Sequence, residues 1–417
     1  MAKSPAPPTS APVRTQHDSR PVVAGIVTAL VGFTSSFAVV LAGLRAVGAD
    51  PAQAASGLLA LTLAVGLGVL LLAWHSKVPV TLAWSTPGAA LLAASGAADG
   101  GWPAAVGAFL AAGVLIALTG LVPALGRLMA RIPTSLAQAM LAGVLLQLCL
   151  APFKALGSVP LLAAPVIICW LLLMKFAPRW AVPAALLVAL GVIGIPLASA
   201  GSVPDTEGLV PALVWTTPSF SLQAMAGIAL PLFVVTMASQ NVPGVAVLHS
   251  FGFKTPWHSS MLVTGAGTVL AAPFGGHAIN LAALSAALAA GDEAGDARGR
   301  RWIAGFTSGL GYLVLAAFSA ALVSVVNAAP AGMLEAVAGL ALLGTLASAA
   351  SAALADPEDR IAPAVTFLMA ASGVALAGIG SAFWALLAGL TVRALLVPRH
   401  RRRAIDQAGN QGTRKGD

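Results

Sequence analysis

Long apolar runs separated by short polar stretches dominate the chain. Runs such as 22–44 and 58–74 are nearly continuous and do not alternate between apolar and polar residues. A membrane-spanning helix needs about 20 predominantly apolar residues, whereas the strands of a membrane barrel alternate with a period of two. The pattern therefore predicts an all-α polytopic membrane protein.

The runs predict about 14 transmembrane segments. We place them at 21–44, 51–74, 84–95, 102–124, 134–150, 159–175, 180–200, 220–241, 257–272, 277–290, 301–327, 331–354, 361–378 and 381–397. Segments 3 (84–95) and 10 (277–290) are too short to cross a hydrocarbon core of about 30 Å as single helices.

Segments 3 and 10 share a sequence pattern. In each, an extended-looking stretch (78–86 or 268–280) meets a Pro/Gly step and a short helical run. Non-helical backbone at membrane depth is tolerated only where protein or a cavity surrounds it. We therefore expect short half-helices in segments 3 and 10, with a site where they meet.

These two segments are seven apart in segment order, and segments 5 and 12 show the same separation. Residues 133–143 (PTSLAQAMLAG) align with 330–339 (PAGMLEAVAG) at the Pro, at Gln138 or Glu335, and at the Ala that follows. Because seven is odd, the second copy enters from the other side, which predicts two inverted seven-segment repeats and a transport site between them. The alternative is a pair of chance Pro/Gly kinks, and the shared spacing favours the repeat.

Composition excludes a soluble domain. Only 9% of the 417 residues are charged, whereas soluble domains carry about 25%, so most of the surface must face lipid. The sequence pI is near 10.3. Excess Lys and Arg in a membrane protein marks cytoplasmic loops, so we expect a lipid bilayer and no nucleic acid as partner.

Positive charge also predicts the orientation. If the N-terminus is cytoplasmic, all of the 22 Lys and Arg residues except Arg45 and Lys154 fall on the cytoplasmic side. One miscounted segment would reverse every later loop, so both termini are expected inside. Residues 1–20 lack the apolar region of a signal peptide and predict a disordered cytoplasmic tail. Residues 398–417 predict a basic cytoplasmic tail that contacts anionic lipid.

The most specific motifs lie in segments 8 and 10. Residues 231–248 (PLFVVTMASQNVPGVAVL) and 273–283 (PFGGHAINLAA) resemble the signatures of the bacterial benzoate/proton symporter family. The resemblance covers about residues 20–397. It implies the seven-plus-seven inverted-repeat fold of nucleobase permeases and sulfate-type anion transporters, in the bacterial inner membrane.

The resemblance further implies two domains. Residues 21–130 and 220–328 (segments 1–4 and 8–11) would form a core domain. Residues 131–200 and 329–397 (segments 5–7 and 12–14) would form a gate domain that carries a homodimer interface, with a periplasmic loop at 201–219. The substrate would lie between the two half-helices.

One departure concerns the pocket. Nucleobase permeases of this fold carry glutamates in segments 8 and 10 that contact substrate or proton, and by motif position these places are Gln240 and His277 here. The change removes fixed negative charge. It suits an anionic substrate, and it leaves proton coupling without those carboxylates.

A carboxylate in a membrane site needs positive potential without a costly buried cation. Two helix N-termini supply it through free N–H groups and the helix dipole, and we expect these donors near 85–88 and 276–279. Ser85 and Thr86 either cap their helix or bind the carboxylate directly.

Segment 10 supplies four further candidates. Gly275 and Gly276 would let a ligand approach the backbone closely. His277 lies within segment 10, whereas the other histidines lie in tails or near loops, and it can titrate near physiological pH, so it is a candidate for substrate binding and proton coupling. The alternative is a hydrogen bond to a neighbour only. Asn280 would share a helix face with His277.

Segments 8 and 1 complete the predicted site. Gln240 and Asn241 are polar residues in an apolar stretch, and buried amides need partners; substrate, segment 10 or helix packing could supply them. Ser36 and Phe33 lie together in segment 1. Phe33 could stack on an aromatic substrate or belong to the ordinary core.

Glu335 is the only carboxylate inside a predicted segment. It falls near the outer end of segment 12, where it is a second candidate for proton coupling, a dimer contact or a charge close to water. The acidic stretch 356–360 predicts a solvated cytoplasmic loop. The two cysteines, Cys149 and Cys169, lie in apolar runs, so we expect no disulfide framework, no metal site and no cofactor.

These features predict a secondary transporter that imports benzoate or a similar aromatic carboxylate with a proton, by an elevator-type movement of core against gate. A carrier of another small organic anion or of a nucleobase, and an anion channel on the same scaffold, stay open as alternatives. The sequence shows no paired carboxylates, metal-ligand cluster or nucleophile–base pair, so an enzyme is not expected.

Overall fold

The computed structural model describes residues 19–122, 124–125, 133–199, 210–327, 329–330 and 332–396. The predicted tails at 1–20 and 398–417, apart from residues 19 and 20, and the first part of the predicted loop at 201–219 lie outside these residues.

Apolar helices form most of the described chain. The first half contains α1 (Arg20–Thr34), α2 (Phe37–Ala46), α3 (Pro51–Ser76), β1 (Leu82–Trp84), α4 (Thr86–Ser95), α5 (Gly101–Leu121), α7 (Thr134–Ser158), α8 (Pro160–Phe176) and α9 (Pro178–Ser199). The second half contains α10 (Leu222–Ala224), η2 (Met225–Ala229), α11 (Leu230–Thr236), η3 (Met237–Asn241), α12 (Val242–Ser250), α13 (Trp257–Ala271), η4 (Ala272–Phe274), β2 (Ile279–Leu281), α14 (Leu284–Ala290), η5 (Asp292–Ala294), η6 (Arg298–Arg300), α15 (Trp302–Ala317), α16 (Ser319–Asn327), α17 (Met333–Ala353), α18 (Ile361–Ala371) and α19 (Ser381–Leu396).

Seven helical stretches within the described ranges are long and apolar enough to cross a membrane. The prediction of a polytopic helical membrane protein is therefore confirmed. Two predicted ends are wrong, because α7 continues to Ser158 and the eighth segment continues through α12 to Ser250. The latter helix passes Pro243 directly after η3, a turn of π-helix, and such local adjustments satisfy the backbone groups that a proline frees.

The predicted first segment is divided in two. The side-chain hydroxyls of Ser35 and Ser36 each donate to the backbone carbonyl of Gly32, at 3.2 Å. Serine hydroxyls compete in this way with the hydrogen bonds of a helix. As a result α1 ends at Thr34 and α2 begins at Phe37.

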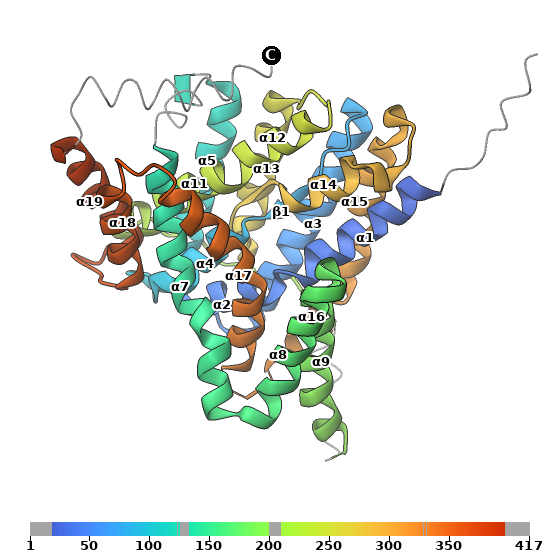
Figure 1. The fold of residues 1–417 in the computed structure, drawn as a ribbon, viewed down its shortest axis with the longest axis horizontal. Helices are drawn as coiled ribbons and strands as arrows, with labels where there is room; N and C mark the ends of the chain where they lie inside the picture. Colours follow the sequence, from blue (N-terminus) through green and yellow to red (C-terminus); the bar gives the residue numbers. More distant parts are fainter. Residues whose placement is uncertain are drawn as a thin grey trace, which may run out of the picture.

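The helices form two groups (Figure 1). On the left, α7 packs against α17 and α18, and on the right α15 packs against α1 and α3. Strand β1 lies between the groups, near the middle of the molecule. Helices α4 and α2 connect to the left-hand group, because α4 packs against α7 and α2 packs against α17.

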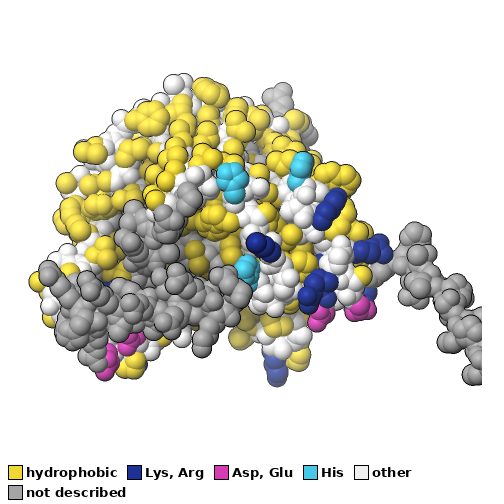
Figure 2. Space-filling model, turned by 90° about the horizontal axis from the view of Figure 1, so that it is seen from above, with side chains coloured by type: hydrophobic (Ala, Val, Ile, Leu, Met, Phe, Trp, Pro, Cys, Tyr) yellow, Lys and Arg dark blue, Asp and Glu magenta, His cyan; other side chains and the backbone are white. Residues whose placement is uncertain are grey.

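Basic side chains gather on one face of the molecule. Figure 2 looks from the top of Figure 1, and Lys and Arg side chains gather on part of this face among many hydrophobic ones. Lys254, Arg298 and Arg300 are exposed, and all three belong to the predicted cytoplasmic stretches. The orientation of the termini stays a prediction.

Candidate functional site

Two chain segments about 200 residues apart cross inside the molecule. Strand β1 pairs antiparallel with β2, so that Leu82 faces Leu281 and Trp84 faces Ile279. The pairing continues beyond the strand, because the backbone N–H of Ser85 donates to the carbonyl of Ala278 at 2.8 Å. We call this buried contact between residues 82–85 and 278–281 the crossing. It places the start of α4 beside residues 277–280.

Ser85 is the N-cap of α4. Its hydroxyl oxygen accepts the backbone N–H of Gly88 at 3.1 Å, and the Thr236 hydroxyl donates to the same oxygen at 2.7 Å. Capping therefore accounts for Ser85 in this structure, and direct ligand contact stays a prediction. Thr236 was missed as a candidate, although it lies inside the segment 8 motif.

We expect Ser85→Ala to destabilise the protein by about 0.5–2 kcal/mol, because an N-cap is lost and the Thr236 hydroxyl loses its acceptor. Thermal unfolding in detergent measures the loss. The matched control is Ser95→Ala at the other end of α4, whose hydroxyl only donates to the carbonyl of Leu91. Equal unfolding temperatures for the two variants would contradict the role of the cap.

His277 lies at the crossing, two residues before β2. The side chain is fully buried, and its ring makes an edge contact with Phe109, with centroids 6.3 Å apart. The backbone of Ala278 is close, but neither ring nitrogen has a hydrogen-bond partner of acceptable geometry. Buried polar groups are rarely left in this state, so the ring is ready to bind a further donor or acceptor.

The predicted second helix N-terminus at 276–279 is wrong. Helix α14 begins only at Leu284, because the preceding residues pair with β1. The N–H of Gly276 donates to the carbonyl of Ala271 and that of Ile279 to the Thr268 hydroxyl. The backbone N–H groups of Gly276 and Ile279 are therefore not free to bind a ligand in this structure.

Gly275 is required for the local backbone conformation. Its φ of 90° is in the left-handed region, where the chain turns from η4 into the extended stretch, and glycine reaches this region without strain. A Cβ would lie 3.1 Å from the carbonyl of Gln53 on α3. Close approach of a ligand to Gly275 or Gly276 stays a prediction.

The predicted helix face shared by His277 and Asn280 is also wrong, since neither residue is helical and Asn280 lies in β2. Asn280 is fully buried and donates to the carbonyl of Leu281 at 2.7 Å, while its side-chain oxygen has no partner. Asn241 accepts the N–H of Leu281 at 2.8 Å, so segment 10 supplies its partner. Gln240, next to it in the π-turn η3, is only half-buried.

Phe33 and Ser36 are engaged in packing. Phe33 is fully buried and stacks on Phe37 at 5.9 Å while meeting Trp84 edge-on at 5.3 Å. The Ser36 hydroxyl accepts the Trp84 indole N–H at 2.7 Å. Trp84 also contacts Tyr312, the only tyrosine of the chain. The structure thus brings both residues to β1, and Trp84 and Tyr312 join a site that the sequence did not assign to them.

Glu335 lies elsewhere. It is half-buried in the first turn of α17 and lines a separate cavity between α4, α7 and α17. It therefore does not join the crossing. Thr86 and Gln240 at the crossing are half-buried, and their contact with a ligand stays a prediction.

The crossing combines neutral polar groups with an aromatic wall. Among the residues that the structure describes, no group of three or more His, Cys, Asp or Glu could hold a metal ion. Uncharged donors beside a helix N-terminus favour an anion. The crossing therefore offers neutral hydrogen-bonding groups that suit a small anion, inside a bundle of apolar helices.

Comparison with known proteins identifies the class of protein. The family model described as benzoate membrane transport protein matches residues 16–395. The chain therefore belongs to the benzoate membrane transport family, and it is a transporter and not an enzyme.

Two relatives extend over most of the chain. The inner membrane protein YdcO of Escherichia coli (strain K12) is 38% identical over 370 residues, which cover 88% of this chain and 93% of the relative. The benzoate membrane transport protein of Acinetobacter baylyi (strain ATCC 33305 / BD413 / ADP1) is 29% identical over 381 residues, which cover 90% and 94%.

Solved structures share the fold at low sequence identity. The anion transporter SLC26A9 superimposes with a TM-score of 0.62 at 14% identity, covering 91% of this chain and 65% of that one. The transmembrane domain of the cyanobacterial bicarbonate transporter BicA gives a TM-score of 0.58 at 17% identity, covering 91% and 98%. These similarities establish the fold.

Proposed function

We propose that the protein imports benzoate or a similar aromatic carboxylate together with a proton across the bacterial inner membrane. The observation that carries the proposal is the fully buried His277 ring, whose two nitrogens lack partners beside the N-terminus of α4. A carboxylate bound next to an imidazole stabilises the protonated ring. Substrate and proton would then favour each other's binding at one place.

The proposed movement is a sliding of a core domain (21–130 and 220–328) against a gate domain (131–200 and 329–397). The fold neighbours and the paired units β1–α4 and β2–α14 support two inverted seven-segment repeats. Substrate would sit at the crossing, in the core domain, and the gate domain would form the homodimer. Both termini would be cytoplasmic.

Uptake into proteoliposomes tests the function. With an inward proton gradient, we expect saturable accumulation of labelled benzoate above the level of empty liposomes, which correct for passive entry of benzoic acid. Collapse of the gradient with a protonophore should abolish the accumulation. Saturable uptake without dependence on the gradient would overturn proton coupling, and flux that never exceeds equilibrium would favour an anion channel. Preferred uptake of another acid or of a nucleobase would overturn the assigned substrate.

A further inference from the structure

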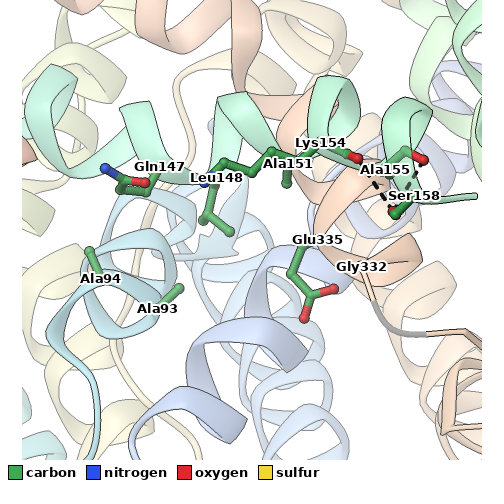
Figure 3. Close-up of a pocket in the computed structure, with 10 residues that line it drawn as sticks. All are labelled: Ala93, Ala94, Gln147, Leu148, Ala151, Lys154, Ala155, Ser158, Gly332 and Glu335. Atoms are coloured by element: carbon green, nitrogen blue, oxygen red, sulfur yellow. Dashed lines mark hydrogen bonds between the residues drawn. The ribbon is translucent and has the colours of Figure 1, made fainter.

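A cavity lies away from the crossing, at the junction of the two helix groups (Figure 3). It has a volume of about 360 Å³, within the range of small-molecule sites. Ala93 and Ala94 from the end of α4 and Leu148 and Ala151 from α7 line it. None of the residues of the crossing contributes, so the two sites are distinct.

The cavity carries opposite charges on its two sides. In Figure 3 the Lys154 side chain runs back along α7 toward Leu148, whereas the Glu335 carboxylate on α17 points away from α7. The charge of Glu335 interacts with that of Arg45 on α2. Lys154 is exposed, and its ammonium group makes no ion pair or hydrogen bond with any residue of the described ranges.

The predicted topology places two basic residues on the outer side of the membrane. They are Lys154, which lines this cavity, and Arg45, which interacts electrostatically with Glu335 on the cavity wall. Basic residues are selected against on that side of a membrane protein. A cation retained there, on a wall of small apolar residues, is suited to an anion that arrives from outside.

We propose that this cavity is an outer capture site for an aromatic carboxylate, which binds there before it reaches the crossing. The ammonium group of Lys154 holds the carboxylate, and the ring lies against Ala93, Ala94 and Leu148. Glu335, whose charge interacts with that of Arg45, repels the carboxylate and orients it toward Lys154. The inference rests on the proposed function for its substrate.

Equilibrium binding and initial uptake rates test the capture site with labelled benzoate. Compared with wild type, Lys154→Gln should raise Kd and KM about fivefold at low salt, the size of one partly exposed ion pair, with the maximal rate within twofold. The difference should shrink near 1 M salt, where the Debye length falls to about 3 Å. Lys154→Arg should retain wild-type values. Lys175→Gln, at the end of α8, is the matched control.

Site protection gives a second readout. In a Cys169→Ser background, Ala151→Cys should react with a membrane-impermeant thiol reagent, and benzoate should slow the reaction several-fold unless Lys154→Gln is also present. Unchanged Kd and KM in Lys154→Gln, or protection that persists in it, would overturn the capture site while leaving the transporter intact. Absence of benzoate binding by wild type would overturn both proposals.

Discussion

Replacement of His277 by alanine is expected to abolish proton-driven accumulation of benzoate in proteoliposomes, lowering it about 10- to 100-fold. This is the effect of losing one hydrogen bond to a charged group, worth about 1.5–3 kcal/mol. The ring is fully buried and its nitrogens are unpartnered, so the imidazole is the titratable group available at the crossing. Coupling requires that proton and substrate strengthen each other's binding.

His277→Gln separates the two roles of the ring. Glutamine retains hydrogen bonding but carries no titratable proton, so exchange of labelled for unlabelled benzoate should continue while accumulation driven by the proton gradient is lost. His249→Ala is the control, because that histidine is exposed at the end of α12. Both activities should be unchanged in this control.

Normal accumulation by both His277 variants would move proton coupling away from the crossing. Glu335, the remaining candidate, would then be tested as Glu335→Gln under the same gradient. Loss of accumulation with retained exchange in that variant would assign the proton to the start of α17.

Local sequence predicted the start of α4 correctly. Ser85 precedes Thr-Pro-Gly, and Ser at an N-cap with Pro in the first turn is a strong signal for a helix start. The apolar runs likewise predicted most of the long helices, because a membrane helix satisfies its backbone within a single segment.

The extended stretch before α14 could not be predicted in the same way. Residues 276–283 have a composition compatible with a helix start, and their conformation is decided by pairing with β1 about 200 residues away. Strand formation depends on such partners more than on local preference. The hydrogen bonds from Thr236 to Ser85 and from Trp84 to Ser36 join distant segments as well, so no local pattern indicated them.

The prediction for the acidic stretch 356–360 also failed because of a contact with a residue distant in sequence. The prediction of a solvated loop is wrong at Asp359, whose side chain is only 3% exposed and accepts a 2.7 Å hydrogen bond from Nε of Arg393 on α19. A buried pair is stable only while both charges are present, since one charge left alone in an apolar interior is costly. The pair fixes the loop between α17 and α18 to the last described helix.

Replacement of Arg393 by leucine is therefore expected to destabilise the protein by about 3–5 kcal/mol, because Asp359 is left buried and charged. Thermal unfolding in detergent, followed by size-exclusion chromatography, measures this. The double variant Asp359→Leu/Arg393→Leu should recover most of the loss, since apolar residues of similar size can replace a buried pair with little cost.

An exposed ion pair provides the control for this experiment. Arg179 and Glu293 are 2.8 Å apart, but their side chains are 49% and 60% exposed, and such pairs contribute about 0–1 kcal/mol. Arg179→Leu should therefore leave the unfolding temperature nearly unchanged. If Arg393→Leu behaved like Arg179→Leu, or if the double variant were as unstable as the single one, burial of an unpaired Asp359 could not be the cause of the instability.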